Sequence, residues 1–159
     1  RIILTEPGPI LTDVPKMPGL DGEKMSKSYD NVISLREEPL EIESKIRKMM
    51  TDPARVRLKD PGNPSNCPVY DLHQVYSSED TKSWVRNGCT NASIGCIDCK
   101  KPLIDSINTE QQIMIERAQQ FEEDPDLVHS IIQEGSEQAR LVARDTLDEV
   151  KECIGISHR

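Results

Sequence analysis

The chain of 159 residues is poor in aromatic side chains, with one Trp, one Phe and three Tyr. A hydrophobic core must therefore be built from Ile, Leu, Val, Ala and Met. No apolar run approaches the roughly 18 residues that a membrane helix needs, and no stretch has the pattern of a secretory signal. We expect a protein without a membrane anchor, long enough for one domain or for a lobe of a larger protein.

The first residue is Arg1 instead of Met, and the apolar residues 2–4 follow at once. We therefore expect a fragment whose N-terminal part is missing. Residues 2–4 predict a short strand, and residues 32–35 predict a second extended run.

Cysteine is present in an odd number, five. Without a secretory signal, this argues against a disulfide framework and for a reducing compartment, so we expect a cytoplasmic protein. Cys153 lies far from the others on the apolar face of the last predicted helix, where we expect a core position.

Four cysteines, Cys67, Cys89, Cys96 and Cys99, have the spacing C-x21-C-x6-C-x2-C. The C-x2-C pair can place two thiolates on one metal, and the two earlier cysteines complete a set of four ligands. Such a set binds zinc or an iron–sulfur cluster. Four unpaired, small hydrophobic residues are the alternative.

Acidic residues outnumber basic ones by 28 to 20, for a net charge of −8. This balance argues against nonspecific binding of nucleic acid. Residues 45–59 differ, with six basic side chains and one acidic one. A local basic segment can contact phosphates, and the alternative is the solvated face of a helix.

Beyond residue 38 the apolar residues recur at helical spacing. Acidic residues and Pro39 predict a helix start, and residues 52–53 its end. Short helices are expected at residues 67–76 and 78–88, followed by a compact loop at residues 89–99.

Two longer helices are expected near the C-terminus, at residues 102–124 and 127–154. Gly135 is expected to mark a break between two helices, and Gly155 suits the residue that follows a helix end. These helices need one another to bury their apolar faces, which predicts a small bundle.

Residues 19–28 read GLDGEKMSKS and lie in a proline-rich loop. Glycine allows positive φ and a close approach of the backbone to a ligand. Lys24 and Lys27 offer compact charges on flexible stems, and Ser26 and Ser28 add hydroxyl donors. This combination suits a polyphosphate, and the alternative is a solvated loop rich in lysine and serine.

The run KMSKS at residues 24–28 is the signature loop of class I aminoacyl-tRNA synthetases, and further motifs agree with it in order and spacing. They are LDGE at 20–23, YDN at 29–31, TDPARV at 51–56, DPGNP at 60–64, DLH at 71–73, GCIDCKK at 95–101 and DPDLV at 124–128. Together they resemble the bacterial tryptophanyl-tRNA synthetases. Tyrosyl-tRNA synthetases are the nearest alternative, but the cysteine run and the DPGNP turn favour the tryptophan family.

The resemblance implies a mainly α fold, in which a helical bundle that binds the anticodon follows the end of a Rossmann-like catalytic domain. The expected division is residues 1–38, with the signature loop, and residues 39–159, with the four-cysteine site. The nucleotide-binding HIGH-type motif and the tryptophan pocket of the family would lie upstream of Arg1.

The resemblance also implies a function, the activation of tryptophan by ATP with Mg²⁺ and its transfer to tRNA(Trp) by a homodimeric enzyme. Lys24 and Lys27 would be catalytic and stabilise the departing pyrophosphate. ATP would contact Lys24, Met25, Ser26, Lys27 and Ser28. Because half of the active site is absent, we expect the chain alone to be inactive in ATP–pyrophosphate exchange.

Some members of this family bind a [4Fe–4S] cluster near the anticodon-recognition region through a similar four-cysteine pattern. The resemblance therefore implies a [4Fe–4S] cluster at Cys67, Cys89, Cys96 and Cys99, with zinc as the alternative.

Contacts with tRNA are expected from four basic side chains, Arg55, Arg57, Lys100 and Lys101. Two other classes of function stay open, a helical RNA-binding module without catalysis and a redox protein built on the cysteines. The complete signature loop argues against the redox protein, because electron transfer does not require a loop that binds phosphate.

Overall fold

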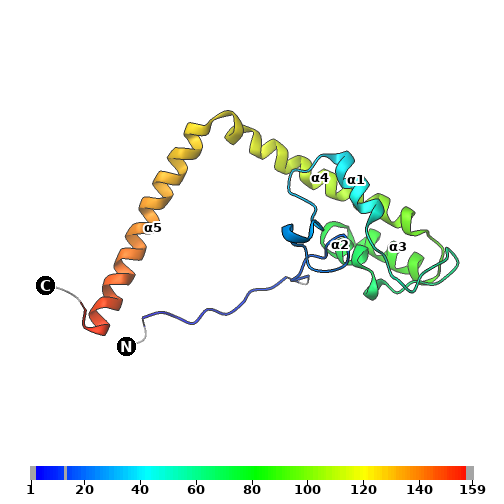
Figure 1. The fold of residues 1–159 in the computed structure, drawn as a ribbon, viewed down its shortest axis with the longest axis horizontal. Coiled ribbons are helices and arrows are strands. Elements are labelled where there is room, and N and C mark those ends of the chain that lie inside the picture. The colour runs from blue at the N-terminus through cyan, green and yellow to red at the C-terminus, as the bar shows by residue number, and fades with distance from the viewer. Residues whose placement is uncertain (1–2, 13, 157–159) are drawn as a thin grey trace. The chain divides into compact units, whose positions relative to one another are not determined.

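A computed structural model describes residues 3–12 and 14–156 of the chain, and it is helical. In chain order the elements are the 3-10 helix η1 (Lys27–Tyr29), α1 (Pro39–Lys48), the 3-10 helix η2 (Pro64–Asn66), α2 (Pro68–Tyr76), α3 (Glu79–Thr90), α4 (Cys96–Glu123) and α5 (Pro125–Ile154) (Figure 1). The expectation of a mainly α fold is confirmed.

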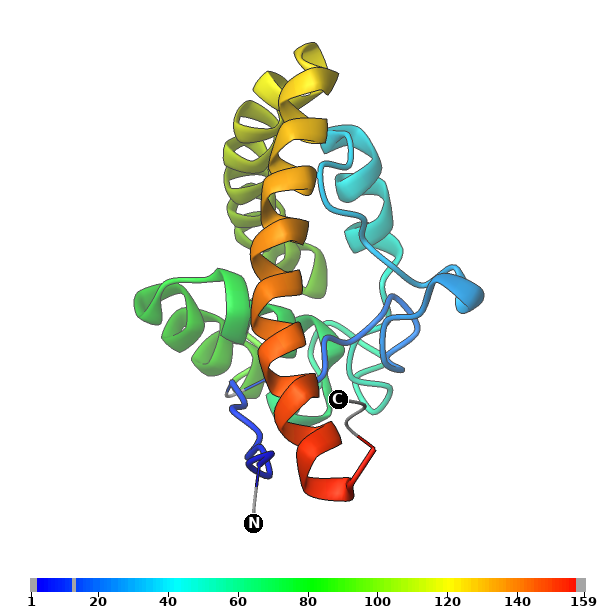
Figure 2. The same ribbon diagram turned by 90° about the vertical axis from the view of Figure 1, so that its left-hand side faces the viewer.

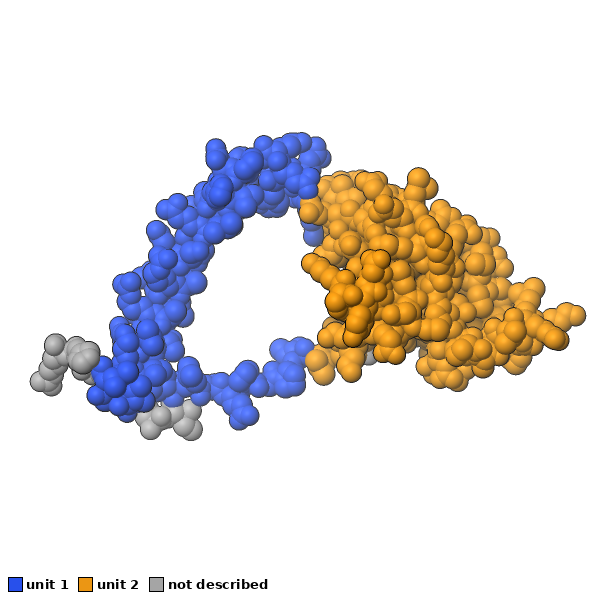
Figure 3. Space-filling model, in the orientation of Figure 1, with its two compact units in different colours: residues 1–10, 117–159 blue, residues 11–116 orange. Residues whose placement is uncertain are grey.

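The chain divides into two compact units (Figure 3). One unit comprises residues 11–116 and contains α1, α2, α3 and the first part of α4. The other comprises residues 1–10 and 117–159 and contains the end of α4 and all of α5.

The helices of residues 11–116 share one hydrophobic core. Branched aliphatic side chains dominate it, as the scarcity of aromatic residues requires. Its buried members are Ile42, Ile46, Met49, Cys67, Val69, Tyr70, Leu72, Val85, Leu103, Ile104 and Ile107. Burial of this kind contributes on the order of 1.5–3 kcal/mol per large aliphatic side chain, so the core is the main stabilising element of this unit.

Local signals set the helix starts. Pro39 is the first residue of α1, where its missing N–H costs nothing. The Ser78 hydroxyl and the Asp124 carboxylate each accept a backbone N–H in the first turn of α3 and α5, at 3.3 and 3.0 Å. The capping bonds confirm the predicted helix boundaries near residues 78 and 124, and the start of α1 at Pro39 confirms the boundary predicted there.

The compact loop predicted at residues 89–99 is wrong. Cys89 lies in the last turn of α3, and α4 already begins at Cys96. The Gly95 carbonyl accepts the N–H of Cys99 at 3.0 Å, which starts the helix ahead of Pro102, so this proline lies inside α4.

The strand predicted at residues 2–4 is also wrong for its described residues 3 and 4, since no strand occurs in the described residues 3–12 and 14–156. Ile2 lies outside these residues. Residues 32–34 have no partner strand, and side chains bind their backbone instead. The Lys45 ammonium donates to the Val32 carbonyl at 3.1 Å, and the Gln111 amide donates to the Ser34 carbonyl at 3.1 Å.

Helix α5 continues through Gly135, so the predicted break is wrong (Figure 2). One glycine inside a helix costs about 1 kcal/mol, which a helix of this length tolerates. Gly155 ends the helix at φ 76°, as predicted. None of the residues of α5 is buried, and Cys153 is exposed instead of lying in a core.

In the part of the chain that the structure describes, none of the helices combines the length and the apolar character that a membrane crossing requires.

Candidate functional site

The signature loop is a tight turn that carries two exposed lysines. Gly22 adopts φ +84° and donates its N–H to the Gly19 carbonyl at 3.0 Å. On either side of this turn, Pro18 and Lys24 form an antiparallel bridge. The turn thereby reverses the chain and leaves Lys24 exposed at the start of the KMSKS run.

The second lysine, Lys27, begins the 3-10 helix η1 and is also exposed. The hydroxyl groups of Ser26 and Ser28 lie 2.8 Å apart and share a hydrogen bond. Among the described residues, neither Lys24 nor Lys27 has a carboxylate partner within ion-pair distance. Two free ammonium groups and two hydroxyls therefore share one loop, a combination that can bind phosphate oxygens.

The loop is attached to the helical core. Leu20 and Met25 are partly buried against the core residues. The N–H of Met50, just after α1, donates to the Leu20 carbonyl at 3.0 Å. A Cβ at Gly22 would lie 2.9 Å from the Met50 side chain and 3.1 Å from Pro68, so the backbone approaches both closely.

The four cysteines of the predicted metal site lie in or directly before three helices of the same unit. Cys67 precedes α2, Cys89 lies in α3, and Cys96 and Cys99 lie in the first turn of α4. Burial, followed by the charges of the other three thiols, raises the pKa of Cys99 to about 12. Burial also raises the pKa of Cys67 and Cys89, with smaller contributions from neighbouring cysteines. The fold therefore gathers the four thiols within electrostatic reach of one another.

The four thiols do not by themselves form a metal-binding geometry. Within residues 3–12 and 14–156, no three His, Cys, Asp or Glu side chains form a group that could hold a metal ion. The donor chemistry nevertheless suits a thiolate-binding metal. The Arg55 guanidinium lies 3.9 Å from the Cys89 sulfur and supplies positive charge, and a Cβ at Gly62 would lie 2.6 Å from the same sulfur.

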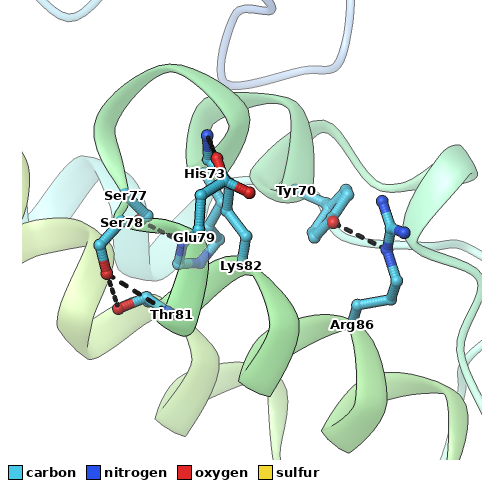
Figure 4. Close-up of polar contacts among 8 residues, drawn as sticks. All are labelled: Tyr70, His73, Ser77, Ser78, Glu79, Thr81, Lys82 and Arg86. Atoms are coloured by element: carbon cyan, nitrogen blue, oxygen red, sulfur yellow. Dashed lines mark hydrogen bonds and ion pairs between the residues drawn. The ribbon is translucent and has the colours of Figure 1, made fainter.

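His73 is a structural residue that contacts Cys99 of this site, and Figure 4 shows its hydrogen bond with Ser77. Its side chain is fully buried, Nδ1 lies 2.7 Å from the Ser77 hydroxyl, and Nε2 lies 3.1 Å from the Cys99 carbonyl. Burial lowers the pKa of His73 to about 4, so its ring is neutral at pH 7. The neutral ring bridges the end of α2 and the first turn of α4.

Three of the four predicted RNA contacts lie at one surface. Arg57 and Lys101 are exposed. Arg55 is half-buried, and its guanidinium donates to the carbonyls of Leu58 and Ile94 at 3.1 and 2.6 Å. A cavity of about 330 Å³ lies here, lined by residues 55–58 and 95–98.

The fourth, Lys100, does not fit the predicted role. Its side chain is buried, with 3% of its surface exposed. The ammonium donates to the carbonyls of Arg47 and Met49 at 2.9 and 2.6 Å, at the C-terminal end of α1. A phosphate contact would leave both carbonyls unsatisfied, so we remove Lys100 from the RNA-binding candidates. Two adjacent lysines look alike in the sequence, and the burial of one was not foreseeable from it.

Comparison with known proteins identifies a family. Residues 2–111 match the family described as tRNA synthetases class I (W and Y). The tryptophan–tRNA ligase of Ralstonia nicotianae is 53% identical over 99% of this chain and 40% of its own length. That of Thermotoga maritima is 48% identical over 97% of this chain and 47% of its own length. The chain thus spans less than half the length of these relatives.

A solved structure agrees with these sequence matches. The tryptophanyl-tRNA synthetase of Campylobacter jejuni, crystallised with ADP and tryptophan, has a TM-score of 0.70 and 25% identity. The likeness covers 88% of this chain and 43% of that one.

The buried Lys100 ammonium makes a direct test of this packing possible. We expect Lys100→Met to lower the free energy of unfolding by about 2–3 kcal/mol, because two carbonyls lose charge-assisted hydrogen bonds. Urea denaturation measures this change. The matched control is Lys101→Met, since Lys101 is exposed and its pair with Asp98 is worth less than about 1 kcal/mol. Equal effects of the two substitutions would contradict the assignment.

Proposed function

Because this chain belongs to the class I tRNA synthetases of the tryptophan and tyrosine family, we propose that it forms part of a tryptophan–tRNA ligase. The observation that carries the proposal is the signature loop, with two exposed lysines on a turn that is attached to the helical core. The named relatives at 53 and 48% identity favour tryptophan over tyrosine as the amino acid.

The first step of this reaction joins tryptophan to AMP. A carboxylate oxygen of tryptophan attacks the α-phosphorus of ATP, an oxygen–phosphorus bond forms, and the bond to the β-phosphate oxygen breaks. Negative charge grows on the departing pyrophosphate. Lys24 and Lys27 contact this charge, and contacts that strengthen as the bond breaks accelerate the step. Mg²⁺, when bound with ATP, neutralises part of the phosphate charge.

The remaining contacts with ATP come from Met25, Ser26 and Ser28. Met25 is partly buried against the core, so its backbone is the fixed point of the loop. In the second step a hydroxyl at the 3′ end of tRNA attacks the acyl carbon, and AMP leaves. In this proposal residues 1–38 serve catalysis and residues 39–159 bind tRNA. The complete enzyme is a homodimer. This chain by itself is inactive in ATP–pyrophosphate exchange.

Removal of one lysine tests the role of the loop. In the complete ligase, Lys27→Ala slows adenylate formation about 100-fold without weakening tryptophan binding to the same degree, because the lost contact acts on the departing group. Single-turnover kinetics measure the rate. Lys16→Ala is the matched control, since Lys16 is exposed and precedes the turn. Equal activation rates for Lys27→Ala and the unmodified enzyme would refute the proposal.

Cys67, Cys89, Cys96 and Cys99 would hold a [4Fe–4S] cluster, with zinc as the alternative occupant. Support comes from the mutual electrostatic effect of the four thiols and from the nearby cations of Arg55 and Lys100, which offset thiolate charge.

Metal analysis separates the cluster from zinc. Purified without air, the protein contains about four iron atoms per chain and absorbs broadly in the visible range. Cys96→Ser removes this absorption, whereas Cys153→Ser leaves it unchanged, because the exposed Cys153 is not among the thiols whose charges act on Cys99. Stoichiometric zinc without iron would select the alternative. The absence of both iron and zinc would contradict a four-cysteine metal site.

The surface of Arg55, Arg57 and Lys101 contacts the anticodon loop of tRNA. The adjoining cavity carries exposed apolar side chains from Val56, Leu58 and Ile97, which suits unstacked bases. This surface also supports the second candidate function, an RNA-binding module without catalysis.

Salt dependence measures these phosphate contacts. We expect Arg57→Gln with Lys101→Gln to reduce the slope of log K against log salt for tRNA binding, by about 0.7 for each lost contact. Lys16→Gln with Lys48→Gln is the control, since both residues are exposed and lie outside the lining of the cavity. The same slope in the test and control proteins would refute the contacts.

A further inference from the structure

Asn31 is a buried polar residue directly behind the signature loop. It follows η1 and Asp30, which adopts a left-handed φ of 52°, and 3% of its surface is exposed. In the sequence it stands out only as the end of the YDN motif. Buried amides are costly unless they are hydrogen-bonded, so its partners indicate what it does.

The Asn31 side chain binds three points of the loop. Its amide oxygen accepts the N–H of Ser26 at 2.8 Å. Its amide nitrogen donates to the Asp21 carboxylate at 2.8 Å and to the Lys24 carbonyl at 3.3 Å. Because an N–H must meet the oxygen and a carboxylate must meet the nitrogen, these partners allow one orientation of the amide.

The backbone of Asn31 completes the attachment. Its carbonyl accepts the N–H of Leu20 at 2.9 Å. A Cβ at Gly19 would lie 2.9 Å from this oxygen and closer still to the amide nitrogen, so the contact requires glycine. The hydrogen bond from Asn31 also lowers the pKa of Asp21, which keeps this acceptor ionised, and Asp21 in turn accepts the N–H of Glu23 at 3.0 Å.

One buried asparagine therefore joins residues 20–21, at the start of the loop, to its central residues. It fixes the backbone at Lys24 and Ser26, while the lysine side chains themselves stay exposed. The amide is hidden behind the loop, so it acts on phosphates only through the two lysines.

We propose that Asn31 is a positioning residue for adenylate formation, whose amide holds the backbone of Lys24 and Ser26 so that Lys24 and Lys27 face the departing pyrophosphate. The catalytic part of this inference rests on the proposed function. The hydrogen bonds from the Asn31 side chain to Asp21, Lys24 and Ser26, which we call the latch, are a property of this chain and can be tested without any activity.

The first arm of the test measures the loop in this chain. Asn31→Ala removes three hydrogen bonds, and ¹⁵N relaxation detects greater motion of the Ser26 and Lys24 amides, while the amides of α1 stay rigid. Asn87→Ala is the matched control, since Asn87 is an exposed asparagine of α3. An equally rigid Ser26 amide in Asn31→Ala and in Asn87→Ala would overturn the latch.

The second arm measures adenylate formation in the complete ligase. Asn31→Ala lowers the rate roughly 10- to 100-fold with little change in the KM for tryptophan, because the lysines lose their alignment. Asn31→Asp lowers it as well, since its carboxylate would face that of Asp21. Asp21→Asn alone retains most of the rate, because its amide oxygen still accepts from Asn31.

A double exchange separates the latch from a general loss of stability. In Asp21→Asn with Asn31→Asp, the new carboxylate still accepts the Ser26 N–H and no longer faces a second carboxylate, although the Lys24 carbonyl loses its donor, so part of the rate lost in Asn31→Asp returns. Thermal melts verify that each variant is folded. No recovery in the folded double variant would overturn the proposal. An unchanged rate in Asn31→Ala would overturn the positioning role alone, whereas an unchanged rate in Lys27→Ala would overturn the proposed function and this role with it.

Discussion

The buried ammonium of Lys100 joins α4 to the end of α1, two segments that are distant in the sequence. It comes from the first turns of α4 and donates to two carbonyls at the end of α1. These carbonyls lack partners within their own helix, so the cation satisfies them and opposes the negative end of the helix dipole. The next residue, Met50, donates its N–H to the Leu20 carbonyl of the signature loop. One buried charge thus connects the cysteine-bearing turn, α1 and the signature loop.

Both candidate sites are built on the same core. Leu20 and Met25 of the signature loop and Cys99 of the cysteine site are partly buried against residues of α1, α2 and α4. Polar side chains add further contacts. His73 of α2 contacts the turn at Cys99. Arg86 of α3 donates to the hydroxyl of Tyr70 in α2 at 3.0 Å (Figure 4). A loop that binds a charged ligand gains from such support, because alignment before binding reduces the entropy that binding must offset.

Features that depend on a few neighbouring residues could be predicted from the sequence. The starts of α1 and α3 follow from Pro39 and Ser78, the end of α4 follows from residues 124–125, and the signature loop is identifiable because several motifs agree in order. Features that depend on distant segments could not. Lys100 and Lys101 are adjacent, and only packing against α1 buries the first. Residues 32–34 look extended but have no partner strand. The burial and hydrogen bonds of Asn31 could not be predicted either, because they form only when the turn at Gly22 reverses the chain.

If Lys100 stabilises the signature loop through the end of α1, native-state hydrogen exchange detects this coupling directly. In the unmodified chain we expect the amides of Met50 and Leu20 to open with a free energy close to that of Ile46 in α1. Lys100→Met should lower all three values together, while Lys101→Met leaves them unchanged. If Lys100→Met lowers the value for Ile46 but leaves Met50 and Leu20 unaffected, the loop does not depend on this cation and the account is wrong.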